Sequence, residues 1–301
     1  MRRVRLWCGA VVGQLVFAVV LAPSPSRSAQ APAVPAVELV RRAVKGEAQA
    51  QDSSRSFLFR DRKQTPRGSQ TRLMAETADA IAAMTIAYDD KPLTPEQRQG
   101  EMNRLRRMAG DSDGLRRKHR QELEDAERVG KIVKALPDAF LYEYAGTEQG
   151  KTGMGIAGRP LTRLTFQPNP RYSPPSRVEL VLTGMQGFVL LDPDANRIAK
   201  IDGTLARDVG FGWGILGHLD RGGRFVVEQG DIGHNSWEIT RMDLSFTGKI
   251  LLFKSINIQS TETFSDFQPL PQDLRFSQAV DMLAKEEATF ADNHHGGEQH
   301  K

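Results

Sequence analysis

The chain has 301 residues, with 41 Lys or Arg and 37 Asp or Glu, so its formal net charge is +4. Residues 1–28 contain four Arg and no acidic residue, and the rest of the chain carries 37 basic and 37 acidic residues. Proteins that bind nucleic acids need surplus Lys and Arg in the folded part, because the phosphates dominate affinity. The balance therefore argues against a nucleic-acid partner. The 39% hydrophobic and 26% charged residues are typical of a globular protein.

The N-terminus has the pattern of a signal peptide over residues 1–28. Arg-rich residues 1–5 precede an apolar run over 6–22, and Ser26-Arg27-Ser28 offers a cleavage site between small residues. We expect export to the periplasm, followed by an Ala/Pro linker over residues 29–36. An uncleaved inner-membrane anchor is the alternative, because the apolar run has 17 residues. The mature chain would contain no cysteine, since Cys8 is the only one.

The first half of the mature chain is expected to mix helices and strands. Apolar residues at helical spacing predict a helix over 37–49. The expected strands are 56–60, 71–74 and 81–88. A helical-hairpin insertion over 94–135 follows, with a capping box at Thr94 and an apolar stripe on its second helix (Leu115, Leu123, Ala126, Val129 and Val133). The second helix is expected to stop before Pro137.

The second half is expected to be a run of antiparallel strands. Short gaps with turn chemistry separate most of them, so hairpins fit better than a parallel βαβ array. The expected strands are 139–145, 162–167, 178–183, 187–192, 197–202, 223–228, 236–246, 249–258 and 262–268. A last helix over 274–290 and a disordered, His-containing tail over 291–301 complete the chain.

Several of these strands are apolar on both alternating positions, as in 178–183, 187–192 and 249–253. An antiparallel sheet with one solvated face should alternate cleanly, so these strands need cover on both faces. A large curved antiparallel sheet with helices on its concave side would supply that cover. A plain sandwich core would supply it equally well.

Motifs for catalysis or cofactor binding fail in their context. Gly212–Gly217 matches G-x-G-x-x-G, but no helix has room to follow it. Gly110–Gly114 matches G-x-S-x-G but follows a charged helix, so it is expected to be a helix–helix turn. Asp192–Asn196 begins like a calcium loop, yet Arg197 stands where the loop needs Gly. No histidine pair has metal-ligand spacing. We expect no cofactor, no metal and no enzymatic activity.

The order of parts resembles the LolA/LolB-like periplasmic lipoprotein-carrier superfamily. The local resemblance lies in Arg177–Leu182, Gly187–Pro193, Asn196–Ile201 and the segment from Trp237 to Lys254. It implies one α+β domain over residues 37–290, an open half-barrel of antiparallel strands with helices packed on its concave side. The long charged insertion over 94–135 departs from the family pattern.

The resemblance implies an exported, non-catalytic carrier or sensor that binds an acyl chain or lipoprotein in an apolar cavity. The expected lining residues are Phe166, Leu180, Leu182, Phe188, Phe225, Trp237, Met242, Leu244 and Phe253. An envelope scaffold of the same fold, docking a protein through 94–135, is the main alternative. An exported hydrolase with a dispersed active site is the third hypothesis.

Overall fold

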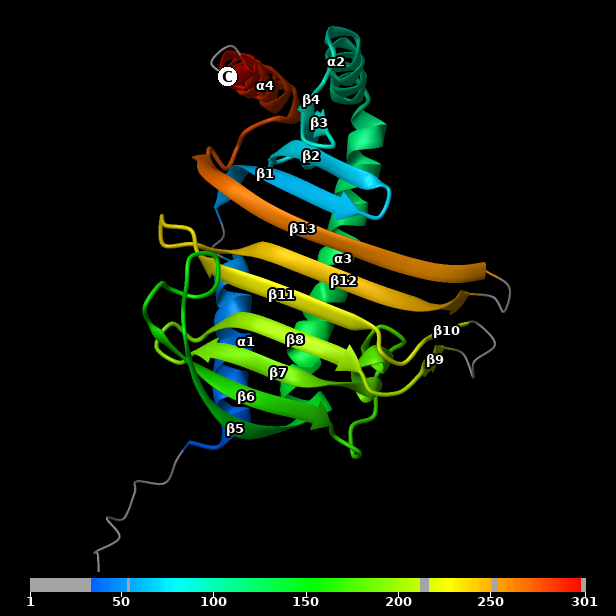
Figure 1. Ribbon diagram of the computed structural model, residues 1–301, viewed down its shortest axis with the longest axis vertical. Helices are drawn as coiled ribbons and strands as arrows, with labels where there is room; N and C mark the ends of the chain where they lie inside the picture. Colours follow the sequence, from blue (N-terminus) through cyan, green and yellow to red (C-terminus); the bar gives the residue numbers. More distant parts are fainter. Residues whose placement is uncertain (1–33, 53–54, 212–216, 251–253, 299–301) are drawn as a thin grey trace, which may run out of the picture. The chain divides into compact units, whose positions relative to one another are not determined.

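The computed structural model describes residues 34–52, 55–211, 217–250 and 254–298. Residues 35–301 belong to one unit, an α+β fold with a large antiparallel sheet (Figure 1). Its helices are α1 (Ala36–Asp52), α2 (Pro95–Gly110), α3 (Ser112–Ala139), η1 (Glu179–Gly184, a 3-10 helix) and α4 (Phe276–Glu298). Its strands are β1 (Ser56–Thr65), β2 (Gly68–Ala75), β3 (Ala82–Tyr88), β4 (Lys91–Pro92), β5 (Phe140–Gln149), β6 (Pro160–Pro168), β7 (Met185–Asp192), β8 (Arg197–Leu205), β9 (Val209–Phe211), β10 (Gly217–Leu219), β11 (Arg224–Asp231), β12 (Trp237–Ile250) and β13 (Lys254–Leu270).

The sheet has 13 strands and stays open, which confirms the predicted α+β class and antiparallel pairing. The strand order is β4-β3-β2-β1-β13-β12-β11-β8-β7-β6-β5, with β9 and β10 attached beside β12. Most neighbours are also consecutive in sequence, as hairpins require. The long-range join is between β1 and β13, which places Ser56 opposite Leu270.

One face of the sheet is covered by α1, η1 and the end of α3. We call it the α1 face. Its core fills the space over β5 to β8, where α1 contacts β5, β7 and β8. The buried members are Val40, Ala43, Leu136, Ala139, Phe140, Leu164, Phe166, Leu182, Met185, Val189, Leu191, Ile198, Leu205 and Val209.

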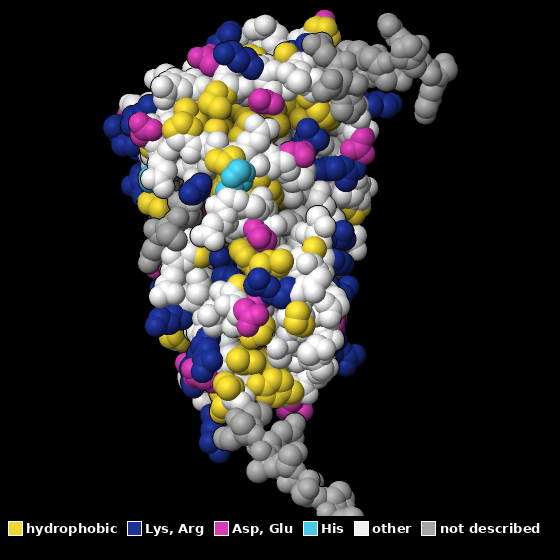
Figure 2. Space-filling model, turned by 90° about the vertical axis from the view of Figure 1, so that its left-hand side faces the viewer, with side chains coloured by type: hydrophobic (Ala, Val, Ile, Leu, Met, Phe, Trp, Pro, Cys, Tyr) yellow, Lys and Arg dark blue, Asp and Glu magenta, His cyan; other side chains and the backbone are white. Residues whose placement is uncertain are grey.

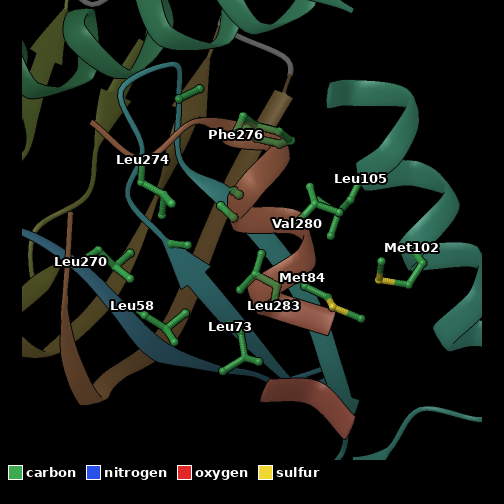
Figure 3. Close-up of a cluster of buried hydrophobic side chains, with 14 of the residues drawn as sticks. Leu58, Leu73, Met84, Met102, Leu105, Leu270, Leu274, Phe276, Val280 and Leu283 are labelled. Carbon is green, nitrogen blue, oxygen red and sulfur yellow. The ribbon is translucent and has the colours of Figure 1, made fainter. Parts of the chain in front are cut away.

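A second core lies on the opposite face, where α2 and α4 pack over β1 to β3 (Figure 3). The strand register assigns the faces. Phe225 of β11 packs against the core of the α1 face and is opposite Leu244 of β12, which is opposite Ser260 of β13. These three side chains therefore lie on the α1 face. Glu262, two residues after Ser260, lies on the same face and is opposite Lys63 of β1. The odd-numbered residues of β1 therefore lie on the α1 face. Leu58 therefore lies on the other face. Figure 3 labels it with Leu73, Met84, Met102, Leu105, Leu270, Leu274, Phe276, Val280 and Leu283.

Side chains of α2 and α3 satisfy the outer backbone groups of strand β3. The Thr85 N–H donates to Glu101 at 3.0 Å, and Arg104 donates to the Ala83 carbonyl at 2.6 Å. The Ile81 N–H donates to Glu122 of α3. Unpaired edge strands invite pairing with other chains, so this capping protects one end of the sheet.

The predicted strand over 178–183 is wrong, because this segment forms η1. Its Leu182 is 2% exposed and packs in the core of the α1 face. Ser176 accepts a hydrogen bond from the Val178 N–H at 3.2 Å, beside the start of the 3-10 helix. A short apolar run fits a buried helical turn as well as a strand, and periodicity cannot separate them.

The predicted break between the strands 236–246 and 249–258 is also wrong. β12 continues to Ile250, and one strand, β13, replaces the two expected over 249–258 and 262–268. Gly248 occupies a position within β12 that requires glycine, because a Cβ there would lie 2.2 Å from the His218 carbonyl oxygen of β10. Glycine here serves a close backbone approach and not a turn.

Two helices run further than expected. α3 passes through Pro137 to Ala139 before β5 begins. α4 continues beyond Phe290 to Glu298, so residues 291–298 are helical, contrary to the expected disordered tail. The helices α2 and α3 meet at Asp111, confirming the helix–helix turn over 110–114. However, the later part of α3 packs on α1 and η1, which differs from a compact hairpin.

Two smaller predictions are confirmed. The Thr94 capping box is formed with Gln97. Asp192 builds the β7–β8 turn by accepting hydrogen bonds from the Asp194 and Ala195 N–H groups. Its carboxylate serves the backbone, as in a hairpin turn. Residues 1–33 and Phe253 lie outside the described residues.

Candidate ligand-binding site

Helix α3 contacts the rest of the fold near its two ends. Leu115 packs against the core under α2 and α4, and Leu136 packs in the core of the α1 face. Between them, residues 123–129 are all exposed. The middle of α3 therefore passes the sheet without packing on it.

The heptad face of α3 shows which way this middle points. Glu122, Val129 and Leu136 are seven residues apart, so they lie on one face of the helix. Glu122 bonds to β3 and Leu136 is 5% exposed in the sheet core. Val129 lies between them on the same side, yet it is 62% exposed. An apolar side chain of α3 is thus directed toward the sheet without a packing partner that buries it.

The sheet offers apolar side chains on the same face. Leu244 pairs with Phe225 of the α1-face core, and Met242 lies two residues along β12 on that side. Ile258 of β13 pairs with Phe246, which packs against the same core. The register of the β13–β1 pair places Phe264 of β13 and Phe59 of β1 on this face as well.

We call these five sheet residues, Phe59, Met242, Leu244, Ile258 and Phe264, the open strip. All five are partly or fully exposed, and Ile258 is 43% exposed. None belongs to the three hydrophobic clusters of the described residues. Phe59 contacts Phe264 edge-on at 6.2 Å and stacks on Phe267 at 5.4 Å between ring centroids. Figure 2 shows hydrophobic side chains in several separate patches on the side of the molecule that it draws.

Two cross-strand ion pairs lie within the strip, because Glu262 is opposite Met242 and Asp61 is opposite Phe264. Asp61 pairs with Arg72 of β2, and Lys63 pairs with Glu262 of β13. Asp61 is 1% exposed, and its Oδ1 has no hydrogen-bond partner among the described residues. Burial raises the pKa of Asp61, although the Arg72 hydrogen bond opposes the shift. The strip therefore carries two ion pairs between its apolar side chains.

Glu47 anchors α1 to the sheet beside this region. Its carboxylate accepts hydrogen bonds from the Ile198 N–H at 2.8 Å and from the Gln229 side chain at 2.6 Å. It also pairs with Arg197 at 2.9 Å. Gly46 allows the close approach, because a Cβ there would lie 2.0 Å from the Asn196 carbonyl oxygen.

Glu238 of β12 faces the same charged cluster. Burial raises its pKa to about 7, and the neighbouring Glu76 and Glu47 add to the shift while Arg197 opposes it. The group therefore titrates near neutrality, at the place where α1 meets the sheet.

The structure separates the residues predicted to line a cavity. Phe166, Leu180, Leu182 and Phe225 belong to or pack against the core beneath α1 and η1. Phe188 and Trp237 pack against a small cluster formed by Met154, Leu161, Leu190 and Ala199, and Phe188 points away from the α1 face because it alternates with Val189. Met242 and Leu244 lie in the open strip. Phe253 is not among the described residues.

Sequence reasoning missed Phe59, Ile258 and Phe264 as site residues. Each lies in a predicted strand, and the run Ser56-Phe-Leu-Phe-Arg60 is a visible apolar signal. Their proximity depends on the pairing of β1 with β13, about which hairpin signals say nothing. In contrast, Leu123 and Val129 stood out as part of an apolar stripe.

Other features of the described residues concern a polar pocket, metal sites and the glycine motif. A pocket of about 420 Å³ on the face opposite α1 is lined mainly by polar residues of β1, β11, β12 and β13. Within the described ranges, no group of His, Cys, Asp and Glu could hold a metal ion. Strand β10 follows residues 212–216 and pairs antiparallel with β9, so a strand stands where a dinucleotide fingerprint needs a helix. No helix in the described part of the chain could cross a bilayer.

Comparison with known proteins gives no identification: no family model, no curated protein and no solved structure matches this chain. The LolA/LolB-like resemblance therefore stays a prediction.

Proposed function

We propose that this protein is an exported, non-catalytic carrier or sensor that holds an acyl chain between the open strip and the middle of α3. The observation that carries the proposal is Val129, which faces the sheet between two packed positions but remains 62% exposed. Exposed apolar groups on two facing elements are typical of a ligand groove.

A length comparison supports a half-barrel form of the sheet. From Glu122, at the β3 edge, to Ala139, before β5, α3 advances about 26 Å at ~1.5 Å per residue. The sheet from β3 to β5 has nine strand spacings, or about 43 Å at ~4.8 Å each. Even with the reach of the Glu122 side chain added, the helix is shorter than the sheet it bridges. The sheet must therefore bend around α3.

An acyl chain suits such a groove because its binding needs burial and no reactive group. Each buried methylene contributes about 0.8 kcal/mol. The ion pairs formed by Arg72, Lys63, Asp61 and Glu262 lie among these apolar side chains and would hold the polar end of the ligand.

The alternative is an envelope scaffold that docks a protein through residues 94–135. Part of this insertion has a structural task, since Glu101, Arg104 and Glu122 cap β3. That task accounts for these charges without a partner, so we favour the carrier.

The direct test measures displacement of an environment-sensitive fluorescent fatty acid, with native mass spectrometry of the exported protein as a second readout. Val129→Lys should abolish binding because it places a charge over the open strip. The fold should survive, since this position is largely exposed.

Leu141→Lys on β5 is the matched control. Leu141 is 46% exposed but lies far along the sheet from the open strip. Full binding by Leu141→Lys and none by Val129→Lys would support the site. A wild-type protein that binds no acyl chain would refute the proposal.

A further inference from the structure

The junction of α2 and α3 concentrates positive charge. Residues 104–120 contain seven Lys or Arg and two Asp, whereas the chain beyond residue 28 is balanced at 37 of each sign. The cations therefore gather within one short stretch at the end of the sheet that α2 and α3 cap.

Three of these cations are not engaged in ion pairs. Arg106, Arg107 and Arg120 are exposed and have no salt-bridge partner among the residues the structure describes. In contrast, Arg104 pairs with Glu101 within α2. Surplus charge is thus displayed to solvent.

The start of α3 also borders an open pocket of about 730 Å³. Its lining includes Arg116, Arg117 and Arg120, with His119 beside them and with Asp113, which pairs with Arg116. Asp79, which also lines the pocket, is already paired with Arg275 at 2.7 Å. The pocket can therefore admit an anionic group among several guanidinium groups, which match phosphate oxygens well.

The composition of this surface distinguishes between possible partners. Protein interfaces depend on buried aromatic and apolar anchors. The large exposed hydrophobic residues of the described chain include none between Pro95 and Glu122. A surface of many cations without such an anchor matches a diffuse anionic layer, where each Lys or Arg adds attraction.

We propose that residues 104–120 dock the protein on a membrane surface by binding the phosphate headgroups of anionic phospholipids. The cations on α2 and α3 contact several headgroups, and the pocket beside Arg116 and Arg120 receives one of them. This docking does not depend on acyl binding at the open strip.

The test is flotation of the full chain with vesicles of phosphatidylcholine alone or of an equal mixture with phosphatidylglycerol. Wild type should bind the mixed vesicles more tightly, and the preference should vanish near 1 M salt, where the Debye length is ~3 Å. The triple variant Arg106→Gln, Arg107→Gln, Arg120→Gln should bind the mixed vesicles roughly a hundredfold more weakly, at about one kcal/mol per cation.

The matched control is Arg67→Gln, Arg171→Gln, Arg177→Gln, which removes the same charge from three exposed arginines on loops elsewhere. It should bind mixed vesicles nearly as wild type. Residues 1–33 are identical in all three proteins, so their contribution cancels. Equal loss in both triple variants would overturn the proposal. So would a wild type indifferent to anionic lipid, the result expected if this surface serves an acidic protein.

Discussion

Helix α1 packs on one face of the sheet, whereas α3 reaches that face only at its C-terminal end and packs Leu115, near its start, against the core of the opposite face. α1 buries Val40 and Ala43, approaches the β7–β8 turn through Gly46 and is fixed by Glu47. α3 is fastened near its ends and leaves residues 123–129 exposed. Helix α1 thus packs against the core along its length, whereas α3 spans the sheet as a bridge that is held only near its ends. The difference shows that a helix can cross a sheet without burying the side chains beneath it. The side chains left exposed in this way form the candidate site.

The largest expected effect is a difference in the free energy of unfolding between a variant at the end of α3 and a variant in its middle. Leu136→Ala removes a side chain that is 5% exposed in the core, so we expect a loss of about 2–5 kcal/mol in the free energy of unfolding. Leu123→Ala removes one that is 57% exposed and should change stability by less than about 0.5 kcal/mol. Urea denaturation measures both. Similar losses would mean that the middle of α3 is packed after all.

The next effect tests the anchor of α1. Glu47→Gln weakens three contacts and leaves Arg197, whose Nε already has no partner in the described residues, without its carboxylate. We expect a cost of about 1–3 kcal/mol. Glu127→Gln on α3, which removes an exposed pair with Lys131, should have no measurable effect. Thermal unfolding of the two variants would show whether α1 is the more firmly held helix.

Glycine-to-alanine changes in the two helices should have opposite signs. Gly46→Ala forces a methyl against the Asn196 carbonyl and should cost about 1–3 kcal/mol. Apart from the local helix backbone, no atom of the described residues lies within 4 Å of the place a Cβ of residue 130 would occupy. Gly130→Ala should therefore stabilise the protein by about 0.5–1 kcal/mol through helix propensity. Destabilisation by Gly130→Ala would contradict an open space beside α3.

A further expected effect is a pH dependence on the α1 side. Glu238 has a folded pKa of about 7 against an ordinary 4.5. Between these values the folded state keeps a proton that the unfolded chain has released, so stability should fall as the pH rises through this window. Above it the loss is complete. Glu238→Gln should flatten this part of the stability profile, and an unchanged profile would assign the dependence to other groups.

The sequence predicted local structure better than it predicted proximity. The capping box at Thr94, the helix over 37–49 and the strands around 56–60 and 71–74 follow from neighbouring residues alone. The segment 178–183 failed because its apolar pattern suits a buried helical turn as well as a strand.

The candidate site was only partly predictable for a related reason. The apolar stripe on α3 is visible in the sequence, but its exposure depends on how far the sheet stands from the helix. Phe59 and Phe264 become neighbours through strands about two hundred residues apart in the chain. Apolar residues such as Phe166 look the same in sequence whether they fill a core or line a groove.

The capped edge of β3 has a consequence for self-assembly. Glu101, Arg104 and Glu122 occupy the hydrogen-bonding groups through which another strand would join that end. In the main strand order, the other end is β5, where most residues are exposed and another strand can add. A pair joined β5 to β5 would use the same patch on both partners and present two blocked ends, so growth would stop at the symmetric dimer. By capping β3, helices α2 and α3 thus disfavour the growth of an open-ended fibre by strand addition.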